Sequence, residues 1–160
     1  MRILMIVGGV FICFVLESVF SAVFGRWFSP NLLLLLVIFI NLFRGIRYSI
    51  FTAVLAGIFK DSYSLGPFGL SIFSLVVCAY LTTVIKMYIY QPGSMPSRVL
   101  LVFVMTVIYV GIMAALAIMS TAVNLGDIFL YVFIPEVVAT TMMTGSAFRR
   151  FRQCALSLSA

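Results

Sequence analysis

Long apolar runs alternate with short polar interruptions along most of the chain. The runs predict six helices, which we expect at Ile3–Phe24, from after Pro30 to about Phe43, and at about Tyr48–Phe59, Phe68–Tyr88, Val99–Ser120 and Ile128–Phe148. A helix needs about 20 residues, within a range of about 17–25, to cross a bilayer. Four of the six runs meet this requirement, and the second and third are short.

Two interpretations of the short pair are open. With Trp27 and Tyr63 at the interfaces, both runs reach spanning length, as tilted or short spans. A re-entrant hairpin would instead place Arg44 and Arg47 deep in the bilayer, at a cost of several kcal/mol unless they are paired or hydrated. We favour two short spans.

The composition makes lipid the main solvent of the chain. It is 64% hydrophobic and 9% charged, whereas soluble domains carry about 25% charged residues. The net charge of +6 does not indicate nucleic-acid binding, because the basic residues lie at the ends of the apolar runs. With a cytoplasmic N-terminus, only Arg26 and Lys60 are external, and the cytoplasmic side carries Arg2, Arg44, Arg47, Lys86, Arg98, Arg149, Arg150 and Arg152.

These observations predict an all-α integral membrane protein. We expect a compact bundle of six transmembrane helices in residues 1–148, a short basic cytoplasmic tail in residues 149–160, and both termini in the cytoplasm. The first run is too long for a signal peptide, contains Glu17 and lacks a clear cleavage site, so we interpret it as a retained helix.

Glu17 and Glu136 are the acidic residues expected at membrane depth. Each lies about 10–12 Å from the outer end of its helix, at 1.5 Å per residue. Three interpretations are open: a hydrogen bond that holds helices together, a contact with a partner, or the handling of protons or a solute. For the first, Ser18 and Ser21, or Thr140 and Thr141, are the candidate neighbours.

The residue types argue against catalysis and against a bound metal. The chain has no histidine, and Cys13, Cys78 and Cys154 do not have the spacing of a metal site. We expect no enzyme activity and no cofactor. Small residues at four-residue spacing are typical of close helix packing in membranes. They recur at Ala53 and Gly57, a stripe that continues to Asp61, at Gly111 and Ala115, and at Thr141 and Gly145.

The stretch "FKDSYSLGPFG" interrupts the apolar pattern between the third and fourth runs. We expect a tight outer hairpin in which Lys60 pairs with its neighbour Asp61 and Gly66-Pro67 forms the turn. Gly69 would let the fourth helix start in close contact with the third. We hypothesise that Asp61 locks the third helix to its neighbours and shapes the surface that partners contact.

Three segments resemble the MreD family of rod shape-determining membrane proteins. These are the proline before a leucine run in "FSPNLLLLLVIFINLFRG", the G-x-x-x-D and glycine-rich turn in "AGIFKDSYSLGPFG", and the basic "FRRFRQ" after the last helix. The family's motif residues correspond here to Pro30, Gly57, Asp61, Gly66 and Gly69. Asn31, Glu17 and Glu136 complete our structural or partner candidates. The family is also similar in fold to the S components of energy-coupling-factor transporters, which implies a compact six-helix bundle.

The resemblance implies a non-enzymatic scaffold or regulatory subunit of the cell-elongation complex, located as a multi-pass protein in the bacterial cytoplasmic (inner) membrane. The implied partners are MreC and the peptidoglycan synthase made of RodA and its transpeptidase, a class B penicillin-binding protein, with the MreB cytoskeleton contacted indirectly. Arg149, Arg150 and Arg152 would contact anionic membrane lipids, at about 1 kcal/mol each. The alternative is a small-solute transporter or an S-type substrate-binding subunit, which would need a water-accessible pocket with several polar groups.

Overall fold

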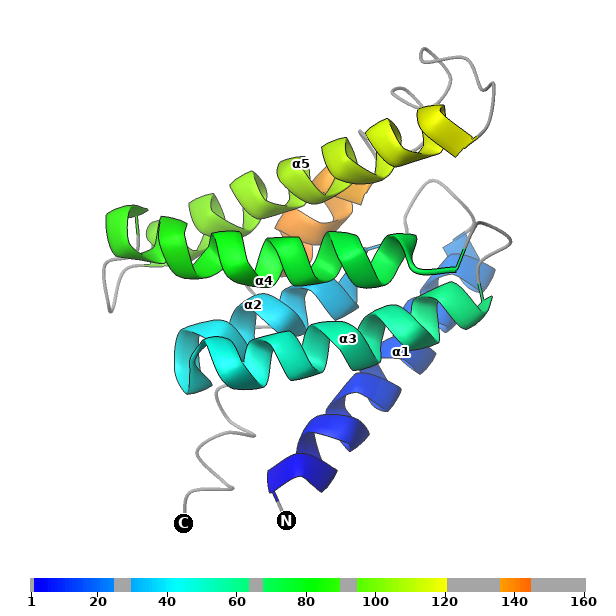
Figure 1. The fold of residues 1–160 in the computed structure, drawn as a ribbon, viewed down its shortest axis with the longest axis horizontal. Coiled ribbons are helices and arrows are strands. Elements are labelled where there is room, and N and C mark those ends of the chain that lie inside the picture. Colours follow the sequence, from blue (N-terminus) through cyan, green and yellow to red (C-terminus); the bar gives the residue numbers. More distant parts are fainter. Residues whose placement is uncertain (1, 25–29, 64–67, 90–94, 121–135, 145–160) are drawn as a thin grey trace.

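The computed structural model describes residues 2–24, 30–63, 68–89, 95–120 and 136–144. Within these ranges every regular element is a helix, which confirms the predicted all-helical class. Figure 1 shows a shorter helix at residues 136–144 and five labelled helices: α1 (Arg2–Phe24), α2 (Leu32–Arg44), α3 (Ile46–Tyr63), α4 (Leu70–Ile89) and α5 (Met95–Ser120). Each corresponds to one predicted run, although α3 extends beyond its predicted run at both ends and α5 begins earlier than predicted.

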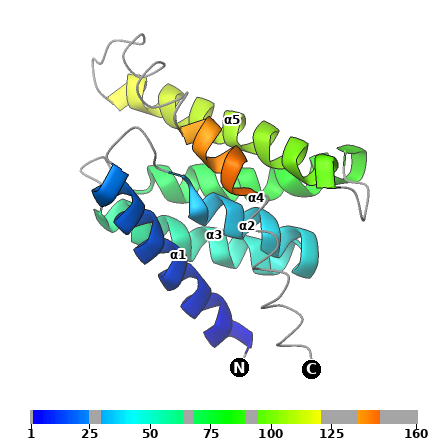
Figure 2. The same cartoon turned by 180° about the vertical axis from the view of Figure 1, so that it is seen from behind.

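The helices α2 to α5 run back and forth, so their ends gather at two ends of the bundle (Figure 1). At the first, which we call the Tyr63 end, α1 and α3 finish and α4 begins. At the second, the Arg47 end, α2 finishes, α3 begins, α4 finishes and α5 begins. Figure 2 shows α1 crossing the bundle obliquely and the 136–144 helix in front of α4 and α5.

Helix α2 is the buried centre of the bundle. All ten residues from Leu32 to Asn41 are buried, and α2 contacts α1, α3, α4 and α5. Its 13 residues span about 20 Å, which is less than the roughly 30 Å thickness of the bilayer core. Because neighbouring helices enclose α2, its length does not have to match the lipid. The N-terminal end of α2 lies inside the protein, so its polar groups need protein partners, whereas Phe43 and Arg44 at the other end are exposed.

A single residue, Gly45, connects α2 to α3. Its φ of 88° lies in the region that favours glycine, and its N–H donates to the Asn41 carbonyl at 3.2 Å. The two helices consequently form a tight antiparallel pair. Two short spans and a re-entrant hairpin would both contain such an antiparallel pair. Our preference for two short spans therefore stays a prediction.

Helix α4 satisfies polar groups at the C-terminal end of α2. The Asn41 side-chain amide donates to the Ala79 carbonyl at 2.7 Å and to the Thr83 hydroxyl at 2.9 Å. The Lys86 ammonium donates to the carbonyls of Asn41 and Leu42 at 3.3 and 3.4 Å. A cation at a helix C-terminus also complements the helix dipole, so Lys86 stabilises this end in two ways.

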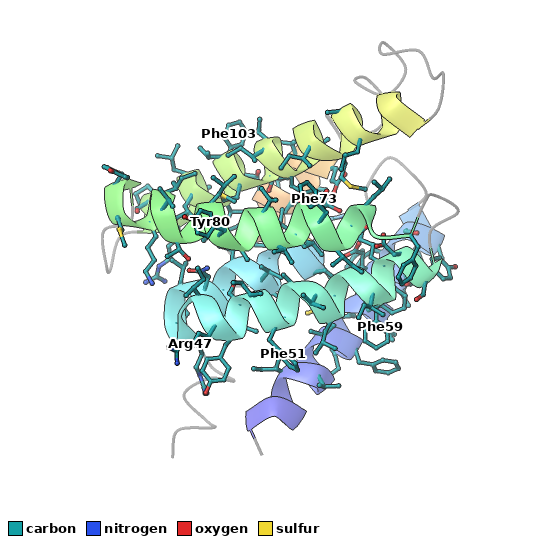
Figure 3. The ribbon with its side chains drawn as sticks, in the orientation of Figure 1. Arg47, Phe51, Phe59, Phe73, Tyr80 and Phe103 are labelled. Carbon is teal, nitrogen blue, oxygen red and sulfur yellow. The ribbon has the colours of Figure 1, made fainter. Side chains whose placement is uncertain are left out.

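The outer surface of the bundle is apolar. Figure 3 shows Phe51, Phe73, Tyr80 and Phe103 on the outside, and these side chains are 42–60% exposed. Three helical segments are long and apolar enough to cross a membrane: Ile6–Val23, Leu70–Tyr88 and Pro96–Leu116. Several polar residues, including Asn31, Asn41 and Asp61, are in contrast buried. Such an exterior suits a protein surrounded by lipid.

Helices α3 and α4 approach most closely at Gly57. A Cβ atom added to Gly57 would lie 2.5 Å from the Cα of Ile72 and 2.8 Å from its backbone nitrogen. The backbone of α4 therefore occupies the space that any other side chain would need. The stripe of Ala53, Gly57 and Asp61 faces inward, as the spacing predicts. Gly111 and Ala115 are exposed instead, so they form no close helix contact within the described part of the chain.

Gly57→Ala should lower the free energy of unfolding by about 1–3 kcal/mol, because α4 must move to admit the methyl group. Thermal unfolding of the purified protein in detergent measures this loss. The control is Gly111→Ala, where an added Cβ meets no atom within 4 Å, and we expect no loss there. Equal unfolding midpoints for the two variants would contradict the close contact.

Candidate functional site

The N-terminus of α2 begins inside the bundle and is capped by Asn31. The Asn31 side-chain oxygen accepts a hydrogen bond from the Leu34 N–H at 3.0 Å, which is the standard bond of an N-cap asparagine. Pro30, directly before it, is also buried. The motif residue Pro30 and its neighbour Asn31 thus form the start of the central helix.

Asn31 also connects α2 to the 136–144 helix. Its backbone N–H donates to the Thr140 hydroxyl at 3.0 Å, and its side-chain amide donates to Glu136 Oε1 at 2.8 Å. Asn31 is 1% exposed, so these bonds replace the water that a helix start would otherwise bind. One residue therefore caps α2 and holds a segment more than 100 residues further along the chain.

Glu17 reaches the same helix start from α1. Its Oε2 accepts a hydrogen bond from the Leu33 N–H at 3.2 Å, and its Oε1 forms an ion pair with the Lys60 ammonium at 3.1 Å. The two side chains are 17% and 24% exposed. The carboxylate thus adds a second, charged cap to α2, and Lys60 from α3 balances its charge.

The partner of Lys60 differs from our prediction. We expected Lys60 to pair with Asp61, but its ion pair is with Glu17, and its ammonium also lies 5.3 Å from the centre of the Tyr109 ring on α5. Consecutive residues on a helix point in directions about 100° apart and do not face each other. The helical geometry directs Lys60 toward α1 and α5 and leaves Asp61 facing α4.

Asp61 caps the N-terminus of α4 from the neighbouring helix. Its Oδ2 accepts from the Gly69 N–H at 2.8 Å, and its Oδ1 accepts from the Ser71 N–H at 3.0 Å. Gly69 has a φ of 107°, a conformation that disfavours the side chains that usually cap helices. Asp61 supplies the missing acceptor and a negative charge at the positive end of the helix dipole.

The roles of the two motif glycines also differ from expectation. We predicted that Gly69 permits close contact, but a Cβ added there would meet nothing within 4 Å. Close contact occurs at Gly57, and Gly69 is required for its positive φ. Gly57 and Asp61 are one helical turn apart, so the G-x-x-x-D pattern brings α4 close to α3 and then caps it.

A pocket of about 290 Å³ adjoins the cap of α2 near the Tyr63 end of the bundle. Residues from three helices line it: Phe14, Glu17, Ser18 and Ser21 of α1, Lys60 and Tyr63 of α3, and Glu136. The pocket therefore brings together both predicted intramembrane glutamates. Their bonding partners are Lys60, Asn31 and the Leu33 N–H, in place of the serine and threonine hydroxyls that we expected.

The other predicted residues fall into two groups. Gly66, Arg149, Arg150 and Arg152 lie outside the described residues, as do Asp127 and Cys154. Cys13 and Cys78 are buried free thiols, and the described ranges contain no cluster of residues suited to a metal ion.

Three roles in the site were not predicted from the sequence. These are Lys60 as the partner of Glu17, Thr140 as the acceptor for Asn31, and Tyr109 beside the ammonium. A lysine within an apolar, helical stretch was the available signal for Lys60. Thr140 was expected only as a neighbour of a glutamate, and nothing in the local sequence distinguishes Tyr109, because both act through residues that are distant along the chain.

The fold and the site define a class: a helical membrane protein whose buried polar side chains bind the ends of its own helices. The chain belongs to the MreD family, since the family model for rod shape-determining protein MreD matches residues 1–148. This match confirms the resemblance seen in the motifs. No curated protein and no solved structure matches the chain.

Lys60→Met should destabilise the protein by about 3 kcal/mol, the lower end of the range for breaking a buried ion pair, because Glu17 loses its counter-charge. The double variant Lys60→Met with Glu17→Gln should recover much of this loss. Chemical unfolding of the four proteins of this cycle measures the coupling. Losses that simply add would show that the pair contributes no coupling energy.

Asp61→Ala should cost about 1–3 kcal/mol of stability, because the N–H groups of Gly69 and Ser71 lose their acceptor. Asp61→Asn should lose less, since the amide oxygen still accepts one bond. Thermal unfolding compares these variants with Ser62→Ala, whose exposed hydroxyl bonds only within α3, to the Ile58 carbonyl. A loss for Asp61→Ala no larger than that of the control would exclude the capping role.

Proposed function

We propose that this protein is a non-enzymatic scaffold or regulatory subunit of the bacterial cell-elongation complex. It binds MreC and, together with MreC, the synthase formed by RodA and its class B penicillin-binding protein, to maintain rod shape. The observation that carries the proposal is the match of the rod shape-determining family model to residues 1–148.

The use of polar groups in the bundle supports a role in binding over one in catalysis. Asp61, Asn31 and Asn41 are engaged with helix ends or with a neighbouring helix, so they are not available as reactive groups. The exposed side chains of α1 are largely apolar. A protein of this kind acts through lateral contacts between helices in the membrane.

The proposed arrangement in the membrane is six spans, with both termini in the cytoplasm. The distribution of charge supports it, because Arg44, Arg47, Lys86 and Arg98 belong to helix ends that meet at the Arg47 end. The positive-inside rule would place that end in the cytoplasm. Residues 149–160 then form a basic cytoplasmic tail, in which Arg149, Arg150 and Arg152 contact anionic lipids.

A second candidate function is a small-solute transporter or S-type substrate-binding subunit. The pocket lined by Glu17, Lys60 and Glu136 is the observation that favours it. Asn41, which we counted among the polar groups for such a site, instead binds Ala79 and Thr83. The polar groups around the pocket are consequently few.

Purification in mild detergent from the native membrane, followed by mass spectrometry of the associated proteins, separates the two functions. The scaffold function predicts recovery of MreC and the wall synthase. Recovery of a pair of ATPases with a coupling membrane subunit would instead identify a transport subunit.

A pair of variants extends this test to the surface shaped by Asp61. At equal expression, Asp61→Ala should reduce recovery of the partners more than Asp127→Ala, because Asp61 fixes α4 against α3. Equal recovery of the partners with both variants would show that partner binding does not depend on the packing of α4 against α3.

A further inference from the structure

The pocket at the Tyr63 end contains more negative than positive side chains. Glu17 has both oxygens engaged, one by Lys60 and one by the Leu33 N–H. Glu136 accepts a bond at Oε1 from the neutral Asn31 amide. Among the described residues, Lys60 and Glu17 form the one ion pair. Among the described lining residues there are thus two carboxyl groups and one ammonium, and the ammonium is paired with Glu17.

A charged carboxylate in this position is stabilised by a positive partner. Removing a charge from water costs several kcal/mol unless it is paired, and acidic residues within membrane helices generally face a partner or a polar cavity. Glu136 lines the pocket, so a group bound there can supply that partner.

The other lining residues suit an alkylammonium group. Phe14 and Tyr63 lie edge to face, with ring centroids 6.1 Å apart and an interplanar angle of 82°. Aromatic rings bind cations through their negative faces and also pack against short alkyl chains. Ser18 and Ser21 add hydroxyl oxygens, which accept N–H hydrogen bonds. Phe14, Glu17, Ser18 and Ser21 have the spacing of one helix face.

The size and depth of the pocket favour a small ligand. Its volume of about 290 Å³ corresponds to about ten water molecules at roughly 30 Å³ each. Lys60 lies three residues from Tyr63, the last residue of α3, or about 5 Å along the helix axis. The pocket therefore lies close to the level at which lipid headgroups are found.

We propose that this pocket binds a primary ammonium group, with Glu136 as its ion-pair partner and the Phe14 and Tyr63 rings against its alkyl part. The ammonium belongs either to a free small amine or to the ethanolamine headgroup of a phospholipid. The proposal does not depend on contacts with MreC or the wall synthase, so its test uses the purified chain without those partners.

Two sets of nanodiscs identify the source of the amine. In discs of phosphatidylglycerol alone, ethanolamine is titrated at constant ionic strength, with choline as the quaternary control, and thermal unfolding is followed. In parallel, native mass spectrometry compares lipids retained from discs of phosphatidylethanolamine and of phosphatidylcholine. A saturable shift with free ethanolamine identifies a small amine, and selective retention of phosphatidylethanolamine alone identifies the headgroup.

Glu136→Gln keeps the shape of the side chain and the acceptor for Asn31 but removes the charge. We expect it to weaken amine or ethanolamine-lipid binding about ten-fold or more, as for the loss of one charge-assisted hydrogen bond. Tyr63→Ala, at a residue that is 75% exposed and so safe for folding, should weaken binding several-fold. The control is Thr141→Val, on the same helix, whose hydroxyl bonds only to the Val137 carbonyl.

Binding by the control variant should equal that of the wild type. The proposal is overturned if neither amine source binds, if choline or phosphatidylcholine binds as well as its ethanolamine counterpart, or if Glu136→Gln and Tyr63→Ala both bind like the wild type. These experiments do not measure the recovery of MreC. The amine-binding proposal can therefore be disproved while the scaffold function stands, and the reverse also holds.

Discussion

Helix ends buried inside the bundle are the constraint on which the rest of the structure depends. The N–H groups at a helix start and the carbonyls at its finish have no partner within the helix, and a membrane interior offers no water to replace one. Helix α2 has this problem above all at its start, which other helices enclose. Asn31 and Glu17 satisfy its start, and Gly45 and Lys86 satisfy its finish.

The charges of the bundle follow from these caps. Glu17 serves the start of α2, and its charge in turn requires Lys60 from α3. Asn31 serves the same start, and its remaining donors recruit Thr140 and Glu136. Helix α1, helix α3 and the 136–144 helix are thereby tied to one point on α2. A few polar residues thus fix the relative positions of helices whose apolar faces alone would pack with little specificity.

The sequence was sufficient to predict the all-helical class and helices apolar enough to cross a membrane, but not how the buried polar residues pair. Apolar runs and the positions of Glu17, Glu136, Gly57 and Asp61 are local signals. Pairing is not local: Glu136 meets Asn31 across 105 residues. Our one pairing based on adjacency, Lys60 with Asp61, was wrong because neighbouring residues point to different sides of a helix. The direction in which each side chain of α3 points depends on where α1, α4 and α5 lie.

The cap that Asp61 provides for α4 has a consequence for how this region can change during evolution. In most helical hairpins the connecting residues must both turn the chain and cap the helix that follows. Here the acceptor comes from the preceding helix, and the receiving N–H groups begin at Gly69. A shift in the register of α3 would therefore displace both this acceptor and Gly57, which lies one helical turn away. The G-x-x-x-D spacing and the start of α4 can consequently change only together.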